Sequence, residues 1–140
     1  MKTISLLAFV LALSISATAF ADDPQSALFA TDYRWGVSVG KSSDLTLRIV
    51  PKQGYHWNKD YPAKIVLKGG QKVAFGKLEL KKATGEIKDD EDKAGVASVS
   101  ARGVAAGDET IDATMSFSVC NKDTCQLIRE RPVKLTVTVK

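Results

Sequence analysis

Residues 111–125 read IDATMSFSVCNKDTC, and this stretch decides the fold class. From Ile111 to Val119 every odd position is apolar, and every even position is Asp, Thr or Ser. Side chains of a β-strand point alternately to its two faces, so the pattern predicts a strand with one face in a core and one in water. Asn121 and Asp123 follow, and both residue types favour turns. We therefore expect a hairpin that turns between the two cysteines.

The same alternation recurs along the chain and predicts an all-β protein. Further strands are expected over residues 35–39, 45–49, 65–67, 73–75, 78–80, 96–99 and 133–139. No window has apolar residues at helical spacing over a normal helix length. About seven or eight short strands of this kind predict two antiparallel sheets packed face to face.

The composition excludes several classes of protein. The 140-residue chain is 44% hydrophobic and 26% charged, which is typical of soluble globular proteins and not of disordered or polytopic membrane proteins. Its net charge of +4 is spread along the chain, so we expect no nucleic-acid partner. Two cysteines and one histidine fall short of the four ligands of a Cys/His zinc site. No glycine-rich phosphate loop precedes a helix pattern, and we expect neither a metal nor a cofactor.

Residues 1–21 have the pattern of a secretory signal peptide. Lys2 precedes a mostly apolar stretch over 4–15, and Ala19-Phe20-Ala21 matches a small-x-small cleavage site. The alternative is a retained anchor, but the apolar stretch is shorter than the roughly 20 residues that span a bilayer. We expect export through the Sec pathway, a periplasmic location, and a mature domain over 22–140 without a transmembrane segment. Disulfides form and persist in that compartment.

The cysteine pair Cys120 and Cys125 brackets the expected turn. Opposed residues of antiparallel strands have Cβ atoms about 4.5–5.5 Å apart. A disulfide needs about 3.5–4.5 Å, so a bond across the turn is within reach. If the odd–even register continues, Cys120 shares the solvent side with Ser116 and Ser118. A bond exposed in this way is open to attack by a foreign thiolate.

Three interpretations of the pair remain open at this point: a redox-active disulfide, a structural hairpin disulfide, and metal ligation. A loop of about six residues gains only about 2 kcal/mol from closure by a disulfide, whereas a 100-residue loop gains about 4–5 kcal/mol. This placement is therefore poor for stapling the fold and good for exchange.

Two stretches resemble the DsbD N-terminal-like family, the N-terminal periplasmic domains of thiol:disulfide interchange proteins. Residues 117–125, FSVCNKDTC, are similar to its aromatic strand followed by Cys-Asn-x-x-x-Cys. Residues 54–58, GYHWN, with Tyr61-Pro62 are similar to its Pro-x-x-Gly-aromatic-His-x-Asn loop, with Pro51 as the proline. The resemblance extends over residues 33–139.

The resemblance implies an immunoglobulin-like β-sandwich in which Cys120 and Cys125 cycle between dithiol and disulfide. It also implies a thiol–disulfide interchange or protein-disulfide reductase component, with a periplasmic thioredoxin-like protein as its partner. The family's transporters continue into a membrane domain and a thioredoxin-like domain, whereas this sequence has no Cys-x-x-Cys. We therefore expect a separate membrane thiol reductase as the electron source. The alternative is a non-catalytic secreted β-sandwich that binds a partner and carries a structural hairpin disulfide.

The aromatic loop around His56 has two interpretations. His56 is the one histidine of the sequence, and it either acts as a base toward a thiol or has a structural role. Tyr55, Trp57 and Tyr61 either form a patch that binds a partner or pack across one end of the sandwich. The acidic stretch 86–93 is expected to be a solvated connection, with an acidic docking loop as the alternative.

Overall fold

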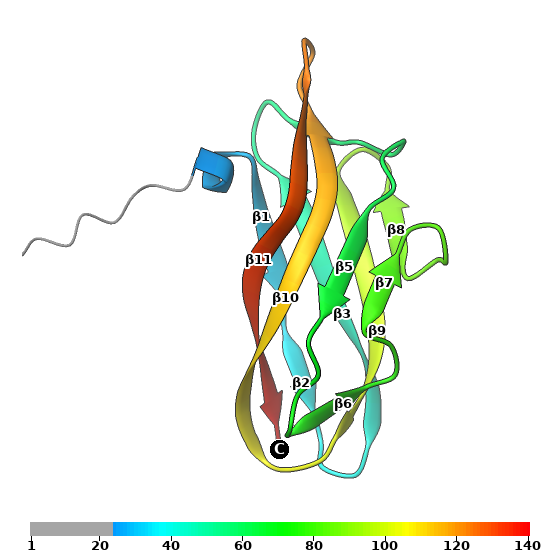
Figure 1. Cartoon of the computed structure of the whole chain (residues 1–140), viewed down its shortest axis with the longest axis vertical. Coiled ribbons are helices and arrows are strands. Elements are labelled where there is room, and N and C mark those ends of the chain that lie inside the picture. Colours follow the sequence, from blue (N-terminus) through cyan, green and yellow to red (C-terminus); the bar gives the residue numbers. More distant parts are fainter. Residues whose placement is uncertain (1–23) are drawn as a thin grey trace, which may run out of the picture.

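The computed structural model describes residues 24–140, which form two β-sheets packed face to face (Figure 1). The expected signal peptide, residues 1–21, lies outside this range. Helical structure in the described range is limited to one 3-10 turn, η1 (Pro24–Ala27). The prediction of an all-β fold with two sheets is therefore confirmed, and the fold is an immunoglobulin-like β-sandwich.

The first sheet has the order β1-β3-β9-β6, and β8 also pairs with β9. Its strands are β1 (Phe29–Tyr33), β3 (Ser42–Pro51), β6 (Val73–Phe75), β8 (Ile87–Asp90) and β9 (Ala94–Gly103). The second sheet has the order β2-β11-β10-β5-β7, and β4 also pairs with β10. Its strands are β2 (Trp35–Val37), β4 (His56–Trp57), β5 (Lys64–Leu67), β7 (Glu79–Lys81), β10 (Gly107–Cys120) and β11 (Cys125–Val139).

The described range holds eleven strands, more than the seven or eight expected. The excess comes from short strands such as β4, which has only two residues and cannot show an alternating pattern. The longer strands agree with the prediction, and their apolar positions form one buried cluster. It includes Leu45, Leu47, Ile49, Ile65, Leu67, Val73, Leu80, Val99, Ile111, Ala113, Met115, Phe117, Val119, Leu135, Val137 and Val139.

Two predicted core residues, Val39 and Leu78, are instead exposed. Strand β2 ends at Val37, two residues before Val39, and Leu78 precedes β7. Both side chains therefore lie outside the regular alternation that would turn them inward. Each stands in a connection between strands, where the period of two no longer applies.

Strands β10 and β11 form the longest ladder, which runs from Gly107 opposite Val139 to Cys120 opposite Cys125. A bulge interrupts it at Glu130, whose φ of 45° lies in the left-handed region. The hydroxyl of Ser116 accepts the backbone N–H of Glu130 at 2.9 Å and satisfies the donor that the bulge removes from the ladder. Beyond the bulge Phe117, Val119 and Ile128 are still buried in the core, and only the tip of the hairpin projects past the sandwich, at the top of Figure 1.

The Trp57 side chain lies between the sheets and fixes strand β4 against β10. Its ring is buried and stacks on Phe117 with centroids 5.6 Å apart. Its indole Nε1 donates to Asp89 Oδ1 at 2.7 Å, and Asp89 also pairs with Lys82 at 2.8 Å. The acidic stretch 86–93 is thus not a mere solvated connection, because it contains β8 and the carboxylate that holds Trp57.

Gly95 faces the Trp57 ring, and a Cβ at this position would lie 2.4 Å from two ring atoms. We expect Gly95→Ala to lower the free energy of unfolding by about 1–3 kcal/mol, the usual cost of overpacking a core. Gly69→Ala is the matched control, because a Cβ there meets nothing within 4 Å. Urea unfolding of both variants measures the difference. If the two variants are equally stable, the packing of the Trp57 ring does not require glycine at position 95.

Candidate functional site

The candidate site is the Cys120–Cys125 disulfide, which closes the tip of the β10–β11 hairpin. The two residues are direct partners in the ladder, with an S–S distance of 2.03 Å and a Cα–Cα distance of 3.9 Å. The predicted hairpin and the bond across its turn are confirmed. Because both cysteines are bonded to each other, neither is available as a metal ligand in this state.

Asn121 organises the turn that the disulfide closes. Its backbone N–H donates to the Thr124 carbonyl at 2.9 Å. Its side-chain Oδ1 accepts the backbone N–H groups of Asp123 and Thr124, at 2.9 and 2.7 Å. The turn residue expected from the sequence therefore does what its type predicts, since Asn side chains commonly bond their own backbone in turns.

The two cysteines differ in exposure, which corrects the prediction that Cys120 faces solvent. Cys120 is only 6% exposed, whereas Cys125 is exposed. Cys120 lies in the interior of the sheet, because its strand pairs with β11 on one side and with β4 on the other. Strand β11 is an edge strand at this height, since in the described range its second neighbour, β2, pairs only with Val137–Val139.

The segment after β4 helps to cover the outer face of β10 beside Cys120. Asn58 donates from its backbone N–H to the Ser118 carbonyl at 3.1 Å and from Nδ2 to the Ser118 hydroxyl at 3.3 Å. Ser118 is 1% exposed as a result. The odd–even register does continue to Cys120, but the face that it predicts to be wet is covered here by a remote segment of the chain.

His56, Cys120 and Cys125 form a row across three adjacent strands. His56 is the Cα partner of Cys120, just as Cys125 is on the other side. Trp57 and Val119, the next pair along, both point into the core, so His56 and Cys120 point to the opposite face. Cβ atoms of directly opposed residues lie about 4.5–5.5 Å apart. The sequence singles out all three residues but gives no signal that β4 places the histidine beside the cysteines.

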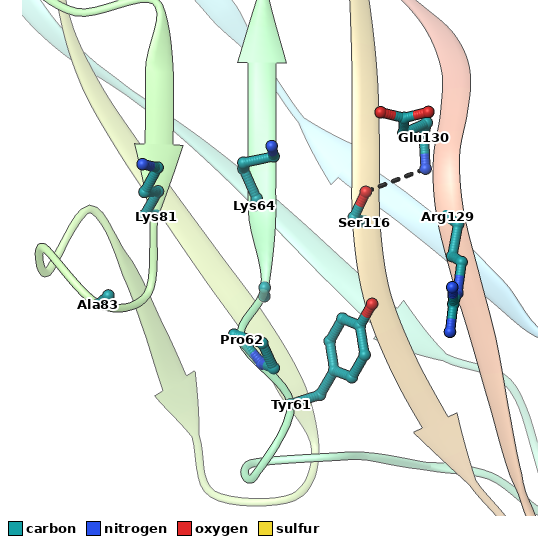
Figure 2. A pocket seen from close by; sticks show the side chains of 9 residues that line it. Tyr61, Pro62, Lys64, Lys81, Ala83, Ser116, Arg129 and Glu130 are labelled. Atoms are coloured by element: carbon teal, nitrogen blue, oxygen red, sulfur yellow. Dashed lines mark hydrogen bonds between the residues drawn. The ribbon is translucent and has the colours of Figure 1, made fainter.

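The aromatic residues of the loop have separate positions. Trp57 is buried and Tyr55 packs against the core, as expected for packing across one end of the sandwich. Tyr61 instead lines a cavity of about 620 Å³ on the outer face of the second sheet. Ser116 and Arg129 line the same cavity and are drawn with Tyr61 in Figure 2. Lys64 and Lys81 also line the cavity, so its rim is rich in positive charge.

Among residues 24–140 no group of three or more His, Cys, Asp or Glu side chains is placed to hold a metal ion. Within the same range no helix has the length and hydropathy needed to cross a membrane.

No protein-family model matches the chain, and no curated protein matches it significantly. Solved structures show similarity of fold. A CARDB domain from Pyrococcus furiosus, solved in complex with di-metal ions, is 10% identical, with a TM-score of 0.41 over 81% of this chain and 94% of that one. A cohesin module from a family 33 glycoside hydrolase of Clostridium perfringens is 11% identical, with a TM-score of 0.38 over 81% and 98%.

A third solved structure is the reduced form of the DsbD N-terminal domain from Neisseria meningitidis. It is 18% identical to this chain, with a TM-score of 0.29 over 84% of this chain and 88% of that one. All three identities and TM-scores are low, so no property of these proteins is assigned to this chain on this basis.

We expect Asn121→Ala to destabilise the hairpin turn, because two backbone N–H groups lose their acceptor. In the reduced protein the loss is expected to be about 1 kcal/mol, the usual net worth of a hydrogen bond. In the oxidised protein it should be smaller, because the disulfide holds the strand ends together. Unfolding measured with and without reductant tests this, with Lys122→Ala as the control in the same turn. An equal loss in both states would contradict the assignment.

Proposed function

We propose that this chain carries out thiol–disulfide exchange through Cys120 and Cys125, in the manner of the DsbD N-terminal-like family that residues 54–62 and 117–125 resemble. The observation that supports this most is the placement of the bond at the tip of a projecting hairpin, with Cys125 exposed. We also propose that residues 1–21 direct export, so that the domain works in the periplasm. Its partners there are a thioredoxin-like protein and a separate membrane thiol reductase.

The geometry favours Cys125 as the sulfur that a partner attacks. A thiolate approaches a disulfide along the S–S axis, from the side opposite the sulfur that leaves. For Cys125 this approach comes from the free edge of β11, whereas for Cys120 it comes from the side that β4 occupies. A mixed disulfide then forms at Cys125, and Cys120 leaves as a thiolate. A second thiol of the partner attacks the mixed disulfide, which leaves a dithiol on this chain and a disulfide on the partner.

The stability of the fold does not depend strongly on this disulfide. The two cysteines are separated by only five positions, and Asn121 already orders the turn between them. Closure of such a small loop contributes only about 2 kcal/mol. The domain is therefore able to lose the bond during exchange without losing its structure.

The alternative is a non-catalytic secreted β-sandwich in which the disulfide only fixes the hairpin. The burial of Cys120 at 6% exposure favours this alternative, because a thiolate is poorly solvated there. The two functions differ in how readily the bond is reduced. Structural disulfides of secreted proteins have potentials below about −300 mV, and exchanging ones have higher values.

A redox titration of the folded domain against glutathione or dithiothreitol tests the proposed function. We expect a potential above about −300 mV, because exposed bonds at turns are more easily reduced. The Cys120→Ser, Cys125→Ser double variant is the control and should fold without exchanging electrons with a thioredoxin-like protein. A potential well below about −300 mV would establish the alternative. So would a double variant that binds its partner as the wild type does, if the wild type shows no exchange with that partner.

Leu127 gives a second test, because it lies beside the disulfide and is 45% exposed. It is two residues from Cys125 and opposite Ser118, so its side chain lies on the same outer face of the sheet as the two cysteines. We expect Leu127→Asp to slow reduction by a protein dithiol about tenfold, since burial of such a side chain is worth about 1.5–3 kcal/mol. Reduction by dithiothreitol should not change.

Val104→Asp is the matched control for Leu127→Asp. Val104 is 54% exposed and follows β9 in the connection that leads to Gly107, at the end of β10 opposite the cysteines. An equal slowing by both variants would show that Leu127 does not contact the partner.

A further inference from the structure

We propose that His56 is the acid that serves this exchange, stabilising the Cys120 thiolate as it leaves and then protonating it. The inference rests on the proposed thiol–disulfide exchange. It gives a chemical role to a residue that comes from a remote part of the chain and lies in the same row as the two cysteines.

The orientation of His56 follows from the way in which β4 is anchored. The Trp57 ring stacks on Phe117, its indole donates to Asp89, and its backbone N–H donates to the Asp92 carbonyl at 2.7 Å. With Trp57 held in the core on one face, the preceding residue must point to the other face of the sheet. That face also carries the side chain of Cys120, the direct partner of His56. Opposed side chains at this spacing are within reach of each other.

The burial of Cys120 creates a need for such a group. A thiolate leaves faster when its conjugate thiol is more acidic. Burial has the opposite effect, because it disfavours the charged form. Cys120 is 6% exposed, so its departure is slow unless a cation or a proton donor faces the sulfur. Histidine is the side-chain type that supplies either near neutral pH.

The partner thiolate attacks Cys125 Sγ and forms a new S–S bond, while the Cys120–Cys125 bond breaks and its electron pair moves to Cys120 Sγ. The imidazolium of His56 transfers its proton to that sulfur and becomes neutral, and water restores the proton. The second thiol of the partner then releases Cys125. The partner dithiol is oxidised, and this chain gains two electrons and two protons.

Other charged groups lie near His56 and the two cysteines, and their effect on the Cys120 sulfur must be distinguished from that of His56. Lys122 and Asp123 lie in the turn between the cysteines, and Asp92 lies in the turn that contacts β4. All three are exposed, as is His56, but none of the three is a ladder partner of Cys120, whereas His56 is. Lys122→Gln removes the one cation among them and serves as the control.

The first experiment titrates a single thiol and needs no partner. In Cys125→Ser the free thiol belongs to Cys120, and its thiolate is followed by ultraviolet absorbance. We expect His56→Gln in this background to raise the pKa of the Cys120 thiol by about one pH unit or more. This is the size of effect that a neighbouring imidazolium has on the pKa of a thiol. His56→Lys should keep the pKa of the thiol low, and Lys122→Gln should change it much less.

The second experiment measures the rate at which dithiothreitol reduces the intact disulfide between about pH 5 and 8. The rate at each pH is divided by the fraction of dithiothreitol that is present as thiolate. We expect the wild type to be about tenfold faster than His56→Gln at the acidic end, which is a modest effect for a proton donor. The advantage should decrease with rising pH, because proton donation requires the protonated form of the donor. His56→Lys should retain a faster rate without this pH dependence. Circular dichroism confirms that each variant is folded.

The outcomes separate this inference from the proposed function. If the wild-type disulfide is reduced readily but His56→Gln leaves both the rate profile and the pKa of the Cys120 thiol unchanged, the role of His56 is wrong and exchange stands. If Lys122→Gln has the same effect as His56→Gln, a diffuse field acts in place of His56, and the inference is again wrong. If the wild-type bond resists reduction under native conditions, the proposed function fails, and the role of His56 fails with it.

Discussion

The buried Trp57 ring is the contact on which the geometry of the disulfide site depends. Strand β4 has only two residues, too few to hold a position by backbone pairing alone. The stack on Phe117, the space left by Gly95 and the hydrogen bond to Asp89 supply what the short ladder lacks. Because Trp57 is fixed, the segments on either side of it lie against the end of β10. Both the cover over Ser118 and the position of His56 follow from this contact.

The different exposure of the two cysteines is a property of the sheet and not of the residues. A residue in a central strand has neighbours on both sides, and Cys120 has β4 and β11. A residue at an edge has one, and Cys125 has only β10 among the described strands. One covalent bond therefore joins a shielded sulfur to an accessible one.

Local patterns predicted the parts of this molecule that depend on neighbours in sequence. Alternation over 111–119 and 133–139 predicted the two longest strands and their buried faces, and Asn121 predicted the turn between them. The exposure of Cys120 could not be predicted in the same way, because the segment that covers it comes from residues 56–58. No periodicity reveals a two-residue strand. The site is thus made partly by local rules and partly by a contact between distant segments, and only the first part is readable from the sequence.

The end of β11 at Val139 lies at the pole of the sandwich opposite the hairpin tip (Figure 1). There Lys140 donates to the Val37 carbonyl at 3.0 Å and accepts from Val39 at 2.8 Å, so the strand is anchored to its parallel neighbour. A linker attached at Lys140 would leave the sulfurs pointing away from its point of attachment. The domain is therefore well suited to immobilisation on a sensor surface or to display on a carrier, with the disulfide at the end away from the attachment point.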